Sequence, residues 1–194
     1  MKLFSTDLYD RPAPELIGGD DVVTEGSYVS FATFSTDRVY RYVLGRVWND
    51  YAPFLVVGML NPSKAGADEN DPTVRRVLAF AHRDRFGGLL VWNAAALVST
   101  DPSALKGHTD PVGPRNYQAI QTCIGRPPLA KSVVAWGAPK NKTIGRILGR
   151  TYVQAASCRP LWRFGEPTKA GHPRHPLYLR SDTPIVRHDG RITR

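Results

Sequence analysis

Polar side chains follow the end of an apolar run in the stretch LVVGMLNPSKAGADENDPTVRR, which spans residues 55–76. Asn61 carries a carboxamide, Ser63 carries a hydroxyl, and a group of acidic residues follows as far as Asp71. Such groups can bind a polar ligand or position a water molecule. In open α/β sheets, ligands bind just beyond the carboxyl ends of the strands. The stretch therefore predicts a binding site at the end of a strand.

Two more apolar runs end in residues that can do chemistry. Asn93 follows the run LLVW, and Trp136 and Gly137 follow the run SVVA. The tail of the chain adds His172 and His175 in the segment GHPRHPLYL. Because the carboxyl ends of parallel strands meet at one edge of a sheet, Asn61 and Asn93 are expected to face the same site.

Each of these residues also has a structural explanation. The Asn61-Pro62 pair is a common turn initiator, Asn93 fits a core amide that braces a loop, and Trp136-Gly137 fits packing followed by a tight turn. Two buried amides at one sheet edge, however, need several hydrogen-bond partners. An amide offers one acceptor and two donors, which suits the edge of a planar ring such as a pyrimidine. The combination favours a bound polar ligand.

Apolar runs alternate with helical patterns along the chain. Strands are predicted over 52–60, 86–98, 130–139 and 150–158, and helices over 71–84, 113–124 and 139–150. The first helix has Asp71 as its N-cap and Pro72 at its first position. Residues 27–48 predict a β-hairpin that turns at STDR. The alternation predicts a three-layer α/β/α domain with a central, mainly parallel sheet of about four strands.

Length and composition set further expectations. The 194 residues favour a single domain over 27–194, which includes the hairpin 27–48 and is preceded by an arm over 1–26. Two distant cysteines and no apolar segment of about 20 residues favour a cytoplasmic protein without disulfides or a membrane span. The spacing of His172 and His175 does not fit a metal site. We expect a monomer with no metal and no cofactor.

The charge balance points to a polyanionic partner. The chain has 26 lysines and arginines against 17 acidic residues, which gives a net charge of +9 and a pI of about 9.8. A bias of this size suits nucleic acid, and DNA is the favoured partner.

Several motifs resemble those of known families. GMLNPS is similar to the Gly-Met/Ile-Asn-Pro-Gly motif of single-strand-selective and mismatch-specific uracil/thymine-DNA glycosylases, and LLVWN is similar to the strand whose terminal Asn reads the uracil edge. VVAWGAPKNK resembles their Trp-Gly segment, and HPRHPLYL resembles their His-Pro-Ser-Pro-Leu loop. More closely, NPSKAGADENDPTVRR, DPVGPRN, AWG and PRHPLYL resemble the bacterial and phage domain of unknown function 1643 family, over residues 41–179. The glycosylase resemblance covers residues 55–179 and implies a uracil-DNA glycosylase-like fold.

The glycosylase resemblance also implies a reaction. A flipped base leaves an oxocarbenium-like sugar, and the enzyme stabilises the base anion and supplies a water. Catalytic roles are implied for Asn61, His175 and Asp71, and Asn93 is implied to read the base edge. Substrate contacts are expected at Gly58, Pro62, Ser63, Trp136, His172 and Leu177, and phosphate contacts at Arg75, Arg76, Arg174 and Arg180. Phe80, Trp92 or Tyr117 is expected to stack on the base, and Leu177 or Tyr178 to fill the gap left in the duplex.

The chain departs from the glycosylase pattern in three places. Ser63 replaces the glycine after Asn-Pro, Lys64 stands where a base pocket prefers a small residue, and Asn61 stands where efficient uracil-DNA glycosylases have an Asp. Asp68, Glu69 and Asp71 are nearby alternative carboxylates, and both tail histidines precede a proline. Two other functions therefore stay open: a non-catalytic module that binds nucleic acid or a modified base, and an enzyme that acts on a free nucleotide.

Overall fold

The computed structural model describes residues 20–25, 28–49, 51–63, 66, 69–125 and 129–190. Within these ranges, one sheet contains β1 (Asp20–Glu25), β2 (Tyr28–Phe34), β3 (Arg41–Val47), β4 (Phe54–Met59), β5 (Gly88–Asn93), β6 (Leu129–Val134), β7 (Leu161–Phe164) and β8 (Ile185–Arg187). The helices are α2 (Pro72–Arg83), α3 (Ala104–Gly107), α4 (Asn116–Gly125), α5 (Lys142–Cys158) and the 3-10 turn η1 (Pro176–Tyr178).

The sheet has eight strands in the order β1-β2-β3-β5-β4-β6-β7-β8. Strands β5, β4, β6 and β7 run parallel, and the strands outside them pair antiparallel. The predicted parallel centre is confirmed. The predicted number of about four strands is wrong, because the N-terminal hairpin does not stand apart: β3 pairs directly with β5 and so extends the same sheet.

The N-terminal part of the prediction holds only in part. The hairpin predicted over 27–48 is formed by β2 and β3, which pair antiparallel. The predicted arm contains β1, which pairs with β2 along its whole length, so this segment belongs to the sheet. Residues 1–19 of the predicted arm, together with Lys64 and Asp68 of the loop after β4, lie outside the described residues.

The strand predicted over 150–158 is wrong. Those residues continue α5, whose buried side chains recur at helical spacing from Ile144 and Leu148 through Thr151 to Ala155. Burial of this stripe outweighs the weak local preference of Thr, Tyr and Val for strands. The fourth parallel strand is β7 instead, which follows directly after the helix.

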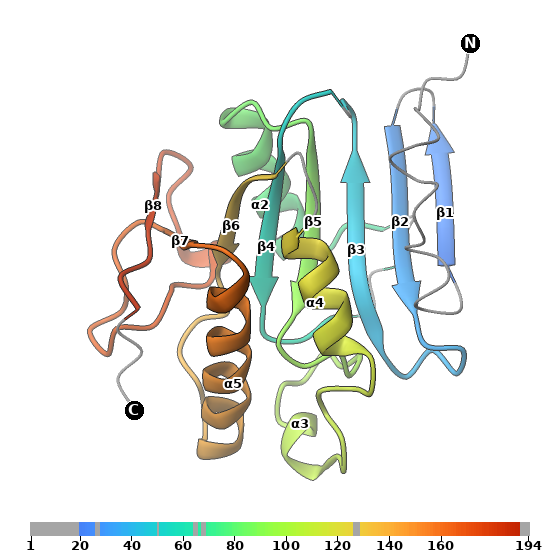
Figure 1. The fold of residues 1–194 in the computed structure, drawn as a ribbon, viewed down its shortest axis with the longest axis vertical. Coiled ribbons are helices and arrows are strands. Elements are labelled where there is room, and N and C mark those ends of the chain that lie inside the picture. The colour runs from blue at the N-terminus through green and yellow to red at the C-terminus, as the bar shows by residue number, and fades with distance from the viewer. Residues whose placement is uncertain are drawn as a thin grey trace.

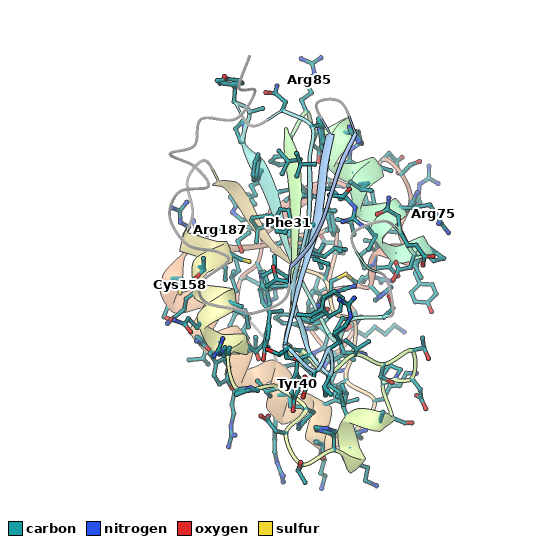
Figure 2. All side chains as sticks on the ribbon, turned by 90° about the vertical axis from the view of Figure 1, so that its right-hand side faces the viewer. Phe31, Tyr40, Arg75, Arg85, Cys158 and Arg187 are labelled. Carbon is teal, nitrogen blue, oxygen red and sulfur yellow. The ribbon has the colours of Figure 1, made fainter. Side chains whose placement is uncertain are left out.

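Helices cover both faces of the sheet (Figure 1). Helix α2 covers one face of the sheet. Its side chains Val74, Val77 and Phe80 share a buried cluster with Leu89 and Val91 of β5. Helices α3, α4 and α5 cover the other face, where Trp92 and Trp136 lie in a second core cluster. Figure 2 shows the two layers from the side of the sheet, with Arg75 of α2 and Cys158 of α5 on opposite sides. Among the described residues, no helix is both long and apolar enough to cross a membrane.

Candidate site at the carboxyl edge of the sheet

The carboxyl edge is the end of the sheet where the four parallel strands finish. Met59, the last residue of β4, pairs with Asn93, the last residue of β5. The pairing continues past the strands, because the backbone amide of Ala94 donates to the carbonyl of Met59 over 2.8 Å. On the other side of β4, the amide of Ala135 donates to the carbonyl of Gly58 over 2.8 Å. The structure thus brings the three polar strand ends to one edge, as the sequence predicts.

Asn93 is a buried amide with an unused donor. Its side chain is 1% exposed and, by the alternation of β5, lies on the same face as Leu89 and Val91, beneath α2. Its Nδ2 atom has no hydrogen-bond partner among the described residues. A buried donor left unpaired costs about 1–3 kcal/mol. An unpaired buried donor needs an explanation, and a ligand bound at the strand end is one.

The side-chain amide of Asn61 forms hydrogen bonds within the loops that follow β4 and β5. Its Nδ2 donates to the carbonyl of Ser99 over 2.8 Å and to that of Pro62 over 3.3 Å. The amide of Ser99 in turn donates to the carbonyl of Pro62 over 2.9 Å. The side chain therefore fixes the turn after β4 against the loop after β5. Only its carbonyl oxygen is left as an acceptor for a water or a ligand.

Asp71 joins the loop to α2. Its Oδ1 accepts a hydrogen bond of 2.7 Å from the amide of Val74, which is the N-cap contact that the sequence predicts. Its Oδ2 accepts a hydrogen bond from the hydroxyl of Ser63. Both carboxylate oxygens thus have partners, so the charge of Asp71 reaches the site mainly through its electrostatic effect on neighbours.

The environment of His175 is set by burial, by the charge of Asp71 and by the backbone of Gly137. Burial lowers the pKa of His175, and the negative charge of Asp71 opposes that shift. The backbone position of Gly137, with φ of +77°, comes so close that a Cβ there would lie 3.5 Å from the Cβ of His175. Nδ1 of His175 accepts a 3.4 Å hydrogen bond from the amide of Leu177. Since Nδ1 accepts, the proton of the neutral ring is on Nε2, where it can be donated.

His172 is more deeply buried than His175. Its backbone amide donates a 3.1 Å hydrogen bond to the hydroxyl of Thr168, and its backbone carbonyl accepts a 2.8 Å hydrogen bond from the amide of Thr168. Burial lowers the pKa of His172, and its Nδ1 has no partner among the described residues. The charge of Asp71 acts on His175 and Gly137 lies close to it, whereas neither is linked to His172, so His175 is the better candidate for the chemistry.

Gly58 and Trp136 have packing roles. A Cβ on Gly58 would lie 2.3 Å from the ring of Trp92, so the strand needs a glycine there to admit the indole. The rings of Trp92 and Trp136 meet edge to face at 6.3 Å, inside the cluster on the face of α4 and α5. Asn93 points to the other face, so neither residue lies beside its side chain.

Two of the three residues expected to stack on a base are buried in the core. Phe80 is buried against Phe164 at a centroid distance of 4.6 Å, and Trp92 is fully buried. Tyr117 is partly exposed on α4. In contrast, η1 presents two apolar side chains to solvent, because Leu177 is 43% and Tyr178 is 83% exposed. These two residues remain candidates for a contact with a partner.

The arginines expected to contact phosphates have protein partners. Arg76 donates to the carbonyl of Leu179 and lies over the ring of Phe80, so it ties the tail to α2. Arg180 pairs with Asp182 at 3.1 Å. Arg174 donates to the carbonyl of Glu166 over 3.1 Å, and Arg75 donates to the carbonyl of Asn70. Arg75, Arg174 and Arg180 are exposed and can rearrange, whereas Arg76 serves the fold.

Sequence reasoning missed three buried polar residues that support the site. Arg46 of β3 donates to the carbonyls of Gly66 and Glu69, at 3.0 and 2.9 Å, and so holds the loop after β4. Arg41 is buried on the same strand, where burial lowers its pKa to about 10 although Asp71 opposes the shift. Asn116 braces the end of β5. Two arginines in the otherwise apolar strand RYVLGRV were the available signal.

Comparisons with known proteins give a family but no reaction. Residues 41–177 match the model of a family described as "Protein of unknown function (DUF1643)", which is more than half of the chain. No curated protein and no solved structure matches the chain. Within the described residues, no group of three or more His, Cys, Asp or Glu side chains is placed to hold a metal ion.

Proposed function

We propose that this chain, which belongs to the family of proteins of unknown function DUF1643, is a nucleobase-directed enzyme with a uracil-DNA glycosylase-like fold. It hydrolyses the N-glycosidic bond of a flipped, pyrimidine-like base in DNA. The observation that carries the proposal is the buried, unpaired Nδ2 of Asn93 at the carboxyl edge. A carbonyl oxygen on the edge of a base would satisfy this donor and remove the cost of its burial.

Other residues at the carboxyl edge supply the remaining parts of such a reaction. Cleavage breaks the bond between C1′ of the sugar and the base nitrogen, and the electron pair leaves with the base. His175, whose lowered pKa keeps it neutral near pH 7, stabilises the base anion by donating a hydrogen bond from Nε2. Asn61 uses its side-chain oxygen to position a water, whose oxygen bonds to C1′. One proton of that water passes to the departing base or to solvent.

A second candidate function is supported by the hydrogen bonds of Asn61 and Asp71. The amide of Asn61 braces the loop, and both carboxylate oxygens of Asp71 have partners. Neither group is then a strong base for deprotonating water. This arrangement favours a module that binds a modified base without cleaving it.

One assay separates the two functions. The protein is incubated with single- and double-stranded oligonucleotides that carry uracil, thymine mismatches or modified pyrimidines, and also with free nucleotides. Alkaline treatment then cuts the strand wherever a base has been released. We expect strand cutting at one class of base. Tight binding of the same oligonucleotides without cutting would support the binding module, and release of base only from free nucleotides would reject a DNA substrate.

A further inference from the structure

The net charge of the chain is concentrated in the segment that builds one face. Residues 104–158 contain eight of the 26 lysines and arginines but only one of the 17 acidic residues, Asp110. This segment therefore carries +7 of the net charge of +9. It forms α3, α4, β6 and α5, and its three helices all lie on the same side of the sheet (Figure 1). An excess of positive charge that is concentrated in one layer creates a positive potential over that side of the protein, and general solubility does not require such an arrangement.

Three of these cations form a line on α5. Lys142, Arg146 and Arg150 are exposed and are spaced four residues apart, so they share one side of the helix. Successive members are separated by about 6 Å along the helix axis. We call this line the α5 stripe. The opposite side of the helix is apolar and buried, so the side chains of the stripe point away from the core.

The α5 stripe is not neutralised within the described part of the chain. Helix α5 contains no acidic residue. The salt bridges found among the described residues involve Arg83, Arg163 and Arg180, and none involves the stripe. Lys142 also stands in the first turn, where a positive charge opposes the helix dipole. Helix stability therefore does not explain its presence.

Glycines leave the backbone open beside the stripe. Gly145 and Gly149 lie on the same side of α5, three residues after Lys142 and Arg146. A Cβ on Gly149 would meet no other atom within 4 Å, and one on Gly145 would meet only Pro139 at 3.9 Å. Each glycine costs about 1 kcal/mol relative to alanine in a helix. The two glycines allow an extended partner to approach the helix closely.

The stripe starts at the candidate site. Helix α5 begins after the N-cap Asn141, whose side chain accepts a 3.0 Å hydrogen bond from the amide of Ile144. Only a short segment separates this cap from Gly137, the residue that lies against His175. A strand bound along α5 would therefore lead to the carboxyl edge of the sheet.

We propose that the α5 stripe binds the phosphate backbone of a nucleic acid and guides it to the carboxyl edge. The inference rests on the proposed function, because it names the surface that holds the polynucleotide. An anionic membrane fits less well, since the apolar side of α5 is buried in the core and no broad apolar face remains to enter a bilayer. Positive side chains at regular intervals, beside glycines that leave the helix backbone accessible, can contact successive phosphates of a nucleic acid backbone.

The test is the salt dependence of DNA binding by two matched variants. The stripe variant combines Arg146→Gln and Arg150→Gln, and glutamine preserves the helix. The control combines Arg85→Gln and Arg187→Gln, two exposed arginines that are not part of α5 and are labelled in Figure 2. Both variants lose two positive charges. Binding of a labelled oligonucleotide is measured by fluorescence anisotropy between about 50 and 200 mM salt.

We expect the slope of log K against log salt, which is negative, to become less steep by about 1.8 in the stripe variant for duplex DNA, or by about 1.4 for a single strand, with little change in the control. Adding Lys142→Gln should make the slope less steep by about 0.7–0.9 more. An unchanged slope, an equal loss in the control, or binding to anionic vesicles but not to DNA would overturn the proposal.

The salt-dependence test of the stripe and the base-release assay of the proposed function can fail independently. If the slope becomes less steep as expected but no base is released, the stripe stands and the glycosylase reaction fails. If bases are released with an unchanged slope, the reaction stands and the stripe fails.

Discussion

The side-chain amide of Asn116 donates a hydrogen bond of 2.8 Å to the backbone carbonyl of Asn93. A second bond, of 3.3 Å, goes to the carbonyl of Ala94. The first residue of α4 therefore holds the end of β5 from the face opposite α2. The backbone of Asn93 is fixed by this contact, while its side-chain Nδ2 has no partner among the described residues.

Replacing Asn116 is expected to destabilise the fold. In Asn116→Ala, two buried carbonyls lose their side-chain donor, which costs about 1–3 kcal/mol in the free energy of unfolding. Urea denaturation measures the loss. Gln118→Ala is the control, because this side chain is exposed on the same helix. Equal unfolding midpoints for the two variants would show that Asn116 does not brace the strand end.

The charge of Asp71 is expected to set the pKa of His175. Asp71→Asn keeps a good N-cap for α2 but removes the negative charge. That charge favours the protonated imidazole, so its loss leaves burial unopposed and the pKa of His175 falls further. An NMR titration of the His175 ring measures the shift, with Asp182→Asn as the control. A pKa of His175 that is the same in Asp71→Asn and in the unsubstituted protein would contradict the link.

Stability is expected to fall when the pH drops from about 7.5 to 5.5. His188 is buried, packs edge to face on Tyr152 of α5 at 5.3 Å, and has no hydrogen-bond partner on either ring nitrogen within the described ranges. Burial and, to a lesser degree, Arg163 of β7 lower its pKa, while Asp189 opposes them. The unfolded chain therefore binds a proton more readily than the folded chain, and stability is lost as pH falls through 6.5 towards the lowered folded value.

Chemical denaturation across this pH range tests the sign. His188→Gln removes one titrating group and should make stability less dependent on pH. His172 and His175 keep part of the dependence, because their pKa values are lowered too. A pH dependence that is as steep in His188→Gln as before would exclude His188 as a cause.

Local signals explain which parts of the fold the sequence predicts. The N-cap Asp71 followed by Pro72 marks the start of α2 because both residues act within one turn. The short apolar runs before Asn61 and Asn93 become parallel strands because both of their faces are covered by helices. These signals also place the two asparagines at one edge, without any knowledge of longer-range contacts.

Tertiary contacts decide the features that the sequence does not reveal. Whether residues 150–158 form a strand or continue α5 depends on the burial of Thr151 and Ala155 against the sheet. The role of Asn116 depends on the strand end that it meets, and the segment NYQAIQTC gives no sign of that partner. The partners of Arg76 are likewise distant in sequence, since Leu179 lies near the other end of the chain.

Asn93→Asp tests the proposed reading of the base most directly. The substitution replaces the donor Nδ2 with an acceptor oxygen, which repels a base carbonyl at the same place. We expect base release by the folded protein to slow by about 1–3 kcal/mol of transition-state stabilisation, roughly five- to 150-fold. The melting temperature should fall as well, because a carboxyl group then replaces the amide at a buried position, so release is measured well below it. Asn49→Asp, an exposed asparagine, is the control for the same chemical change. If Asn93→Asp leaves the melting temperature, the choice of base and the rate of release unchanged, Asn93 does not read the base and the glycosylase proposal is contradicted.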